Sequence, residues 1–369
     1  MKRSRDSELH GKSLSITSKE LVSSLLTAFA ADKETEVKPQ DVLGSSPPPS
    51  SSPLPTIPSI FIEPMIVTFC RDLDGLLGGG FRIGDVTEIV GLPGTGKTQL
   101  LMQLCLNVQL HSLLGGCGGE ALIIDAEGAV SVERLSQMAE AMSSHVRKIT
   151  RRFPDSERPP IRAVASTTAL LSGVHIAKAY NFSDFTATIA SLYEFLSKNP
   201  KVRLVCIDSI ACHLRYGPLA ASSNPRPRTG MLLQLAQSLN EIAERFNVAI
   251  IASNHMTTKF LKGNAHGKSF SIIGSNIKSR IEPALGELWS SACTRRIKLS
   301  FETNPNSGIR AGNRLATVEK EPIRYRDCAK VLDTPQMPPP RSAYFIISSE
   351  GIRGIPPPPR KQVVLQEQA

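Results

Sequence analysis

Short apolar segments alternate with amphipathic segments through the middle of the chain. Runs rich in Val, Ile and Ala indicate buried strands, and apolar residues at three- and four-residue spacing indicate helices. Strands are expected at 85–90, 121–125, 202–208 and 248–253, and helices at 97–110, 132–149, 185–196 and 232–246. Strands that are apolar along nearly their whole length and alternate with helices are typical of parallel sheets. The pattern therefore predicts an α/β fold with a mostly parallel central sheet flanked by helices.

The two ends of the chain differ from this middle part. Thr17 and Glu20 form a capping-box pattern ahead of apolar residues at helical spacing, which predicts a short helix within 17–31. Residues 33–59 are rich in Pro and Ser, a composition typical of disordered linkers. We therefore expect a mostly disordered segment over 1–60, a folded core over 61–355 and a disordered Pro-rich tail over 356–369.

Composition excludes several classes of protein. The chain has 369 residues, of which 41% are hydrophobic, as in ordinary soluble proteins. It contains no apolar run long enough to span a membrane, and its charged N-terminus is not followed by the apolar stretch of a secretory signal. Its 7 cysteines form no C-x-x-C pair, which argues against a zinc cluster or disulfide framework and favours a reducing compartment.

Residues 91–98 carry the clearest candidate chemistry. They match the phosphate-binding pattern G-x-x-x-x-G-K-[ST] at every position, between a predicted strand and a predicted helix. Lys97 is expected at the β- and γ-phosphates, and the Thr98 hydroxyl at Mg²⁺. A chance glycine-rich turn is the alternative, which this context disfavours. The predicted nucleotide-binding residues are Gly91, Leu92, Pro93, Gly94, Thr95, Gly96, Lys97, Thr98 and Gln99.

Three carboxylates lie at the ends of predicted strands. Asp208 ends the strand 202–208, where a carboxylate can hold Mg²⁺ together with Thr98, although an aspartate there can also cap a helix. Asp125 and Glu127 end the strand before it, where one of them can direct water onto the γ-phosphate. Glu127 has the longer reach, whereas Asp125 can support Mg²⁺ or cap a turn. Spacing alone does not choose between them.

Two segments without acidic residues follow core strands and are read as basic loops. The net charge of +10 favours a polyanionic partner, but many basic proteins bind none. Segment 212–229 includes Arg215 and Arg228, and segment 257–280 includes Lys259, Lys262, Lys268, Lys278 and Arg280. Such loops suit phosphate backbones, and solvated surface loops are the alternative. Tyr216 can stack on a base, although a packed tyrosine is the commoner arrangement.

The order of motifs along residues 65–355 resembles the ATPase core of the RecA-like homologous-recombination proteins. Within that family it is most similar to the eukaryotic recombinase paralogues, in particular their C-type branch. The resemblance is carried by the phosphate loop and by the segments 73–80, 124–128, 132–135, 205–209, 253–259, 283–289 and 294–298.

The resemblance assigns roles to individual residues. Glu127 takes the place of the catalytic glutamate, Arg134 the place of an arginine that stacks on adenine, and the two basic segments the places of DNA-binding loops. Asn254 and His255 fall where relatives carry a polar pair that senses the γ-phosphate. Catalytic roles are thus implied for Glu127, Lys97 and Asp208.

The resemblance also implies a function. It suggests a RecA-like P-loop fold that binds ATP and Mg²⁺, and a slow DNA-dependent ATPase of homologous recombination and double-strand-break repair. Its expected role is to assist the assembly of strand-exchange filaments. The expected partners are single-stranded or branched DNA, sister paralogues and the main strand-exchange recombinase, in the nucleus and away from membranes.

Three departures from the family pattern leave alternatives open. His255 stands where relatives usually carry Gln, the N-terminal helix-hairpin-helix domain of the parent recombinases is not recognisable, and the linker has no clear F-x-x-A docking motif. One alternative is therefore an ATP-binding scaffold subunit of a repair complex without significant hydrolysis. Another is a P-loop kinase of a small molecule, against which the long basic segments argue.

Overall fold

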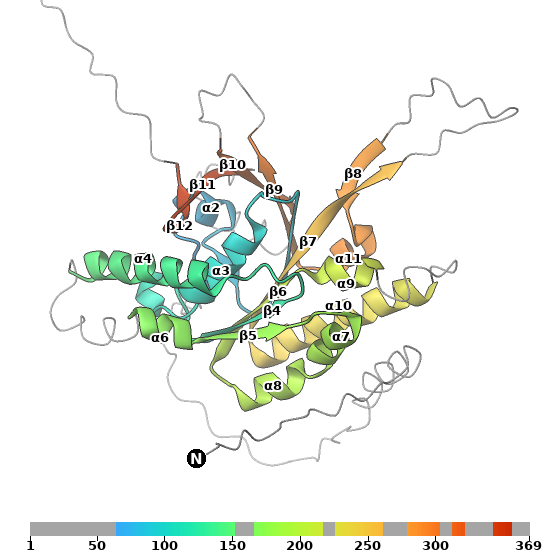
Figure 1. Cartoon of the computed structure of the whole chain (residues 1–369), viewed down its shortest axis with the longest axis horizontal. Coiled ribbons are helices and arrows are strands. Elements are labelled where there is room, and N and C mark those ends of the chain that lie inside the picture. The colour runs from blue at the N-terminus through green and yellow to red at the C-terminus, as the bar shows by residue number, and fades with distance from the viewer. Residues whose placement is uncertain are drawn as a thin grey trace, which may run out of the picture. The chain divides into compact units, whose positions relative to one another are not determined.

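Figure 1 shows the computed structural model of the chain, which describes residues 64–151, 166–216, 226–260, 279–302, 312–321 and 342–355. All of them belong to the unit from Ile57 to Ala369. The predicted helix within 17–31, the Pro/Ser-rich linker and the tail 356–369 lie outside the described residues.

The described residues form helices and strands in alternation. The helices are α2 (Arg71–Leu76), α3 (Lys97–Asn107), the 3-10 helix η1 (Ser112–Leu114), α4 (Val132–Thr150), α6 (Thr167–Ser172), α7 (Phe182–Ala190), α8 (Leu192–Lys198), α9 (Ile210–Tyr216), α10 (Arg226–Phe246) and α11 (Gly286–Ala292). The strands are β1 (Met65–Ile66), β2 (Phe81–Arg82), β3 (Val86–Gly91), β4 (Glu120–Asp125), β5 (Val174–Lys178), β6 (Val202–Asp208), β7 (Ala249–Phe260), β8 (Ser279–Pro283), β9 (Arg295–Phe301), β10 (Arg314–Lys320), β11 (Ser342–Ser348) and β12 (Gly351–Gly354).

One large sheet organises these elements, in the order β12-β11-β10-β9-β3-β7-β6-β4-β5. The strands from β9 to β5 run parallel, and β10, β11 and β12 extend the sheet in antiparallel fashion. Strand β8 pairs with the distal part of β7, away from the other strands (Figure 1). The predicted fold class, an α/β core with a mostly parallel sheet, is confirmed.

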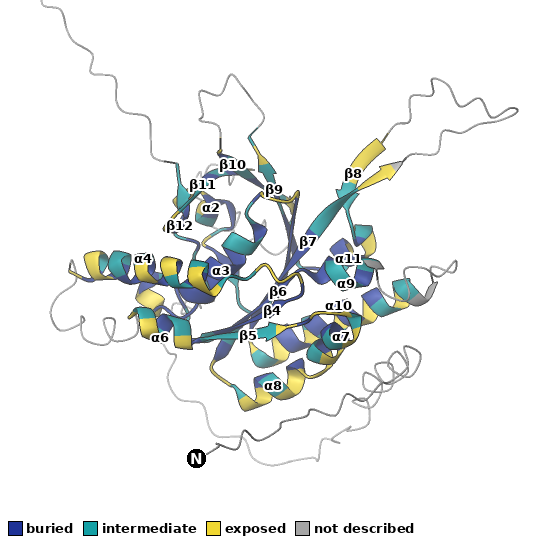
Figure 2. Cartoon of the chain, viewed as in Figure 1, coloured by how far each residue is buried: buried dark blue, intermediate teal, exposed yellow. Residues whose placement is uncertain are grey.

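Alternate residues of the central strands face two separate apolar layers. On one face, Leu122, Val205 and Ile250 pack with residues of α7, α8, α10 and α11. On the other, Ile123 and Cys206 pack with residues of α2 and α3. Helix α4 covers the outer side of α3. Figure 2 shows β4, β6 and the inner part of β7 as mostly buried, which explains their nearly continuous apolar sequence.

The structure differs from the sequence-based prediction in several places. The predicted helix 185–196 is two helices, α7 and α8, which meet at Ser191. The predicted strand 248–253 continues as β7 to Phe260. Its outer residues lie beyond the apolar core, and pairing with β8 supplies hydrogen-bond partners for their backbone groups. Lys259 and Arg280 therefore lie on paired strands, where the sequence suggested a loop. Arg215, also predicted to lie on a loop, lies on helix α9.

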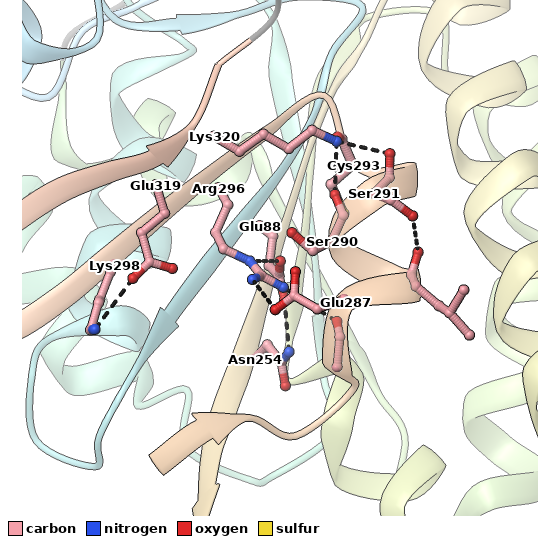
Figure 3. A network of polar contacts seen from close by, with 12 residues as sticks. Glu88, Asn254, Glu287, Ser290, Ser291, Cys293, Arg296, Lys298, Glu319 and Lys320 are labelled. Atoms are coloured by element: carbon pink, nitrogen blue, oxygen red, sulfur yellow. Dashed lines mark hydrogen bonds and ion pairs between the residues drawn. The ribbon is translucent and has the colours of Figure 1, made fainter. Parts of the chain in front are cut away.

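A charged cluster is buried where β3 lies between β7 and β9 (Figure 3). Glu88 is fully buried, and its Oε2 accepts a hydrogen bond of 2.7 Å from Nε of Arg296. Its Oε1 accepts one of 2.7 Å from Nδ2 of Asn254. Burial raises the pKa of Glu88, against the opposing effects of Arg296 and Asn254. A buried carboxylate needs such partners, so this cluster fixes β3, β7 and β9 relative to one another.

Helix α11 is held at its two ends by cations of the neighbouring strands β9 and β10. Near its start, Arg296 contacts Glu287 and donates to the carbonyl of Gly286. At its end, Nζ of Lys320 donates to the carbonyls of Ser290, Ser291 and Cys293, as Figure 3 shows. A cation at a helix C-terminus satisfies carbonyls that have no partner within the helix.

We expect Arg296→Met to lower the free energy of unfolding by about 3–5 kcal/mol near neutral pH, since it leaves the Glu88 charge without its main partner. Burial then acts on Glu88 with less opposition, so its folded-state pKa rises further. The folded variant binds a proton that the unfolded chain releases, and its stability falls as pH rises through that pKa. Urea unfolding at about pH 5 and about pH 8 measures both effects.

The control is Arg71→Met, which removes an exposed arginine of α2. The double variant Glu88→Gln/Arg296→Met should recover much of the lost stability, because no charge is left buried. An Arg296→Met protein as stable as the wild type at both pH values contradicts the importance of this pair.

Candidate functional site

The phosphate loop joins the end of β3 to the start of α3. Gly94 and Gly96 have φ values of +80° and +104°, which L side chains rarely adopt. A Cβ at Gly91 would lie 2.6 Å from the carbonyl oxygen of Leu299, so glycine is needed there as well. The local sequence therefore dictates a turn whose N–H groups point to one place, at the positive end of α3.

Lys97 is held inside this loop. It is only 7% exposed, and its Nζ donates hydrogen bonds to the carbonyls of Gly91 (2.9 Å) and Leu92 (3.2 Å). Burial lowers its pKa, against the pull of Asp208 and Glu127. The Lys97 cation thus lies among the loop carbonyls.

Asp208 connects three elements at the carboxyl edge of the sheet. Its Oδ2 accepts a hydrogen bond of 2.6 Å from the Thr98 hydroxyl on α3, and its Oδ1 one of 2.5 Å from the Ser253 hydroxyl on β7. Burial raises the pKa of Asp208, and these two hydrogen bonds oppose the rise. The predicted pair of Thr98 and Asp208 is therefore in contact, and Ser253 is a third member that sequence reasoning did not single out.

This oxygen set fits a magnesium ion. Hydroxyl and carboxylate oxygens are hard ligands of the kind that Mg²⁺ prefers, and such sites take their remaining ligands from phosphates and water. Within the described part of the chain, no group of three or more His, Cys, Asp and Glu side chains could hold a metal by itself. Thr98 and Asp208 are accordingly the residues that would hold the ion beside a nucleotide.

Asp125 and Glu127 have different surroundings. Asp125 is buried and accepts hydrogen bonds from the backbone N–H groups of Ala129 (3.1 Å) and Val130 (3.3 Å), so it caps the turn after β4. Glu127 lies within that turn, and its Oε1 contacts Nε2 of His255 on β7. Burial opposes ionisation of Glu127, but the contacts with His255 and the charge of Lys97 outweigh it and lower its pKa. Glu127 is thus the ionised carboxylate that faces the phosphate loop.

Arg134 lies in the first turn of α4, which the Ser131 side chain caps. Its Nε donates to Oε1 of Gln99 (2.8 Å), directly after the phosphate loop. Its Nη1 and Nη2 donate to the carbonyls of Ser349 (2.7 Å) and Ser348 (2.6 Å) in the turn between β11 and β12. Arg134 therefore joins three segments beside the loop, and stacking on adenine stays a prediction.

Asn254 and His255 point in opposite directions because side chains alternate along β7. Ser253 and His255 share the face on which α3 lies. Ser253 donates to Asp208, which also accepts from Thr98 of α3, and His255 contacts Glu127. Asn254 lies on the other face and contacts Glu88. His255 therefore lies at the site, and Asn254 lies on the opposite face of the sheet. Glu88, in the interior of the predicted strand 85–90, is a signal of this network, since a buried charge requires a partner.

The structure brings three of the predicted DNA-binding cations to one region. Nη2 of Arg215 on α9 donates to the hydroxyl of Thr257 on β7 (2.8 Å). Lys259 and Arg280 lie opposite each other farther along β7 and β8. Arg228 lies in α10 and is half-buried. The other predicted contacts, Lys262, Lys268 and Lys278, lie outside the described residues.

Within the described ranges, no helix combines the length and the apolar character needed to cross a membrane.

Comparison with known proteins identifies the family of the chain. The Rad51 family profile matches residues 63–151 and 162–303. The chain is 34% identical over 271 residues to the DNA repair protein RAD51 homolog 3 of Cricetulus griseus, a segment that covers 73% of this chain and 67% of the relative. It is also 34% identical over 237 residues to the protein of the same name from Dictyostelium discoideum, which covers 64% and 57% of the two chains. The chain therefore belongs to the Rad51 family of RecA-like recombinases, as a paralogue of the C type.

Proposed function

We propose that this chain is an ATP-dependent DNA-binding protein of homologous recombination and double-strand-break repair, which assists the assembly of strand-exchange filaments. Membership of the Rad51 family and similarity to two DNA repair proteins support a role in recombinational repair. The observation that carries the proposal of ATP turnover is the meeting of Lys97, Asp208 and Glu127 at one edge of the sheet.

The proposed mechanism assigns each group one task. The loop N–H groups and Lys97 bind the β- and γ-phosphates, and Thr98 with Asp208 would hold Mg²⁺, which neutralises phosphate charge. Glu127, kept ionised, orients a water toward the γ-phosphate and accepts its proton. Arg134, which Gln99 and the carbonyl of Ser348 hold in place, would stack on the adenine base.

The second candidate function is an ATP-binding scaffold of a repair complex without significant hydrolysis. The contact between His255 and Glu127 favours it, because a carboxylate held by imidazole is less available to activate water. In either case we propose sister paralogues and the main strand-exchange recombinase as protein partners, and the nucleus as location. The short basic clusters at 2–5 and 360–361, which lie outside the described residues, support nuclear entry.

Lys97→Ala is expected to weaken ATP binding by about 100-fold or more, because it removes a buried charge-assisted contact to phosphate. Titration calorimetry with ATP and Mg²⁺ measures the affinity. Lys148→Ala, which removes an exposed lysine of α4, is the matched control. Equal ATP affinity in the Lys97 variant and the wild type would show that the loop does not bind nucleotide in this way.

Glu127→Gln keeps the shape of the side chain and removes its charge. It should leave ATP affinity within about threefold and slow single-turnover cleavage by about 100-fold or more, the usual contribution of a positioned base. The comparison variant is Asp125→Asn, which should act on stability because Asp125 caps a turn. Surviving turnover in the Glu127 variant together with its loss in the Asp125 variant would identify Asp125 as the catalytic carboxylate.

The same assay with and without single-stranded DNA separates the two candidate functions. A DNA-dependent ATPase turns over faster with DNA. A scaffold binds ATP tightly but shows no turnover in either condition.

DNA affinity should depend on the cations of α9, β7 and β8. Replacing Arg215, Lys259 and Arg280 by Gln is expected to reduce the slope of log affinity against log salt by about 2, at about 0.7 per phosphate contact on single strands. The loss should be similar for unrelated base sequences, because phosphate contacts carry little sequence information. A control triple variant neutralises the exposed Arg71, Lys148 and Lys201. A salt slope equal to that of the control would exclude this region from DNA binding.

A further inference from the structure

The outer parts of β7 and β8 form a two-stranded ribbon, residues 256–260 and 279–283. Its register places Thr257 opposite Glu282 and Lys259 opposite Arg280. Because opposite and alternate residues of an antiparallel pair share one face, these four side chains lie together. Figure 2 shows β8 exposed toward its outer end, and the Lys259 and Arg280 side chains are 65% and 73% exposed.

Two cations directly opposite each other destabilise such a ribbon. Glu282 compensates for this, since its Oε2 lies 3.4 Å from Nζ of Lys259 and its Oε1 lies 3.6 Å from Nε of Arg280. Each oxygen of one carboxylate thus faces one of the two cations. Glu282 is only 27% exposed and lies nearer the core than either partner.

Both ion pairs are loose. Their distances exceed the roughly 2.7–2.9 Å of a charge-assisted hydrogen bond. Exposed pairs of this kind contribute little to stability and are screened by water and salt. A phosphate group offers several oxygens to the same two cations and can displace the carboxylate at small cost. Arg215, which reaches Thr257 at the base of the same face, adds a third positive group beside them.

We propose that Glu282 is an internal counter-ion that occupies Lys259 and Arg280 in the free protein and yields them to nucleic-acid phosphates. It lowers the affinity of this face for the backbone and thereby sets how strongly the protein holds DNA. The inference rests on the proposed DNA-binding function. It assigns a role to an acidic residue on a surface whose other functional residues are cations.

The test compares Glu282→Gln with Glu194→Gln. Glu194 is an exposed glutamate of α8 that is also paired with a lysine, Lys198, so both variants change the net charge equally. Fluorescence anisotropy with a labelled oligothymidine, over a series of salt concentrations, gives the affinity and its slope. Glu282→Gln should bind about three- to tenfold more tightly at low salt. Its salt slope should steepen by about 0.7, one further effective phosphate contact.

A double-mutant cycle shows whether the effect acts through the two cations. In a Lys259→Gln/Arg280→Gln background, the gain from Glu282→Gln should shrink to that of the control. If it persists there, or if Glu194→Gln produces the same gain, the effect is one of net charge and the proposal is overturned.

A variant that keeps the negative charge distinguishes the proposed effect from a folding defect of Glu282→Gln. Glu282→Asp withdraws the carboxylate by one methylene, and it should bind DNA with an affinity between those of the wild type and Glu282→Gln. An affinity at or below that of the wild type overturns the proposal, even if Glu282→Gln does not fold. If neither the wild type nor any variant binds the oligonucleotide, the DNA-binding function itself fails, and this inference fails with it.

Discussion

The buried carboxylate of Asp208 is the interaction on which the rest of the site depends. Asp208 belongs to β6, and its carboxylate accepts one hydrogen bond from a hydroxyl of α3 and one from a hydroxyl of β7. A single side chain therefore fixes the relative positions of three elements. Burial raises its pKa, which means that the carboxylate is held ready for a cation at some electrostatic cost. The phosphate loop, the turn that carries Glu127 and the face of β7 that carries His255 are all placed relative to this group.

Strand β7 has two different tasks on its two faces. Ser253 and His255 serve the site beside α3, and Asn254 between them joins the buried pair of Glu88 and Arg296. A shift of one residue in the pairing of β7 would exchange these faces. It would bury His255 against α11 and remove Ser253 from Asp208. The contact between Asn254 and Glu88 therefore favours the observed register of β7.

The sequence predicts the central fold well because its strands are buried on both faces. The segments 121–125 and 202–208 are apolar except for Arg203 and the aspartate that ends each of them, and the loop 91–98 has a pattern that few other structures require. The half-exposed strand β5 has no comparable run, and it pairs with β4, which is distant in the sequence. Strands β10 and β12 also lack such a run, whereas β11 contains one at 343–347 for which no strand is predicted.

Site residues that belong to a sequence motif could be predicted. Contacts that depend on the three-dimensional arrangement of the strands could not. Lys97, Thr98 and Asp208 follow from spacing, but the division of roles between Asp125 and Glu127 depends on which backbone N–H groups the turn presents. Likewise, the direction of the Asn254 side chain follows from the alternation of side chains along β7. The predicted strand ends at residue 253, so this alternation is not extended to Asn254. Glu282 is unremarkable in the sequence, because only the β7–β8 register shows that it lies between two cations.

Strand β7 is continuous from the core to the outer end of the ribbon, and this has a mechanical consequence. From Ser253, which contacts Asp208, to Phe260 the strand spans seven residues, about 23 Å at the usual rise. One end of this span lies beside Asp208, and the other end belongs to the ribbon that carries Lys259 and Arg280. A tilt of about 5° at Ser253 displaces the backbone at Phe260 by about 2 Å over that length. Adjustments too small to disturb the packed core can therefore reposition the cations by a distance comparable to a hydrogen bond.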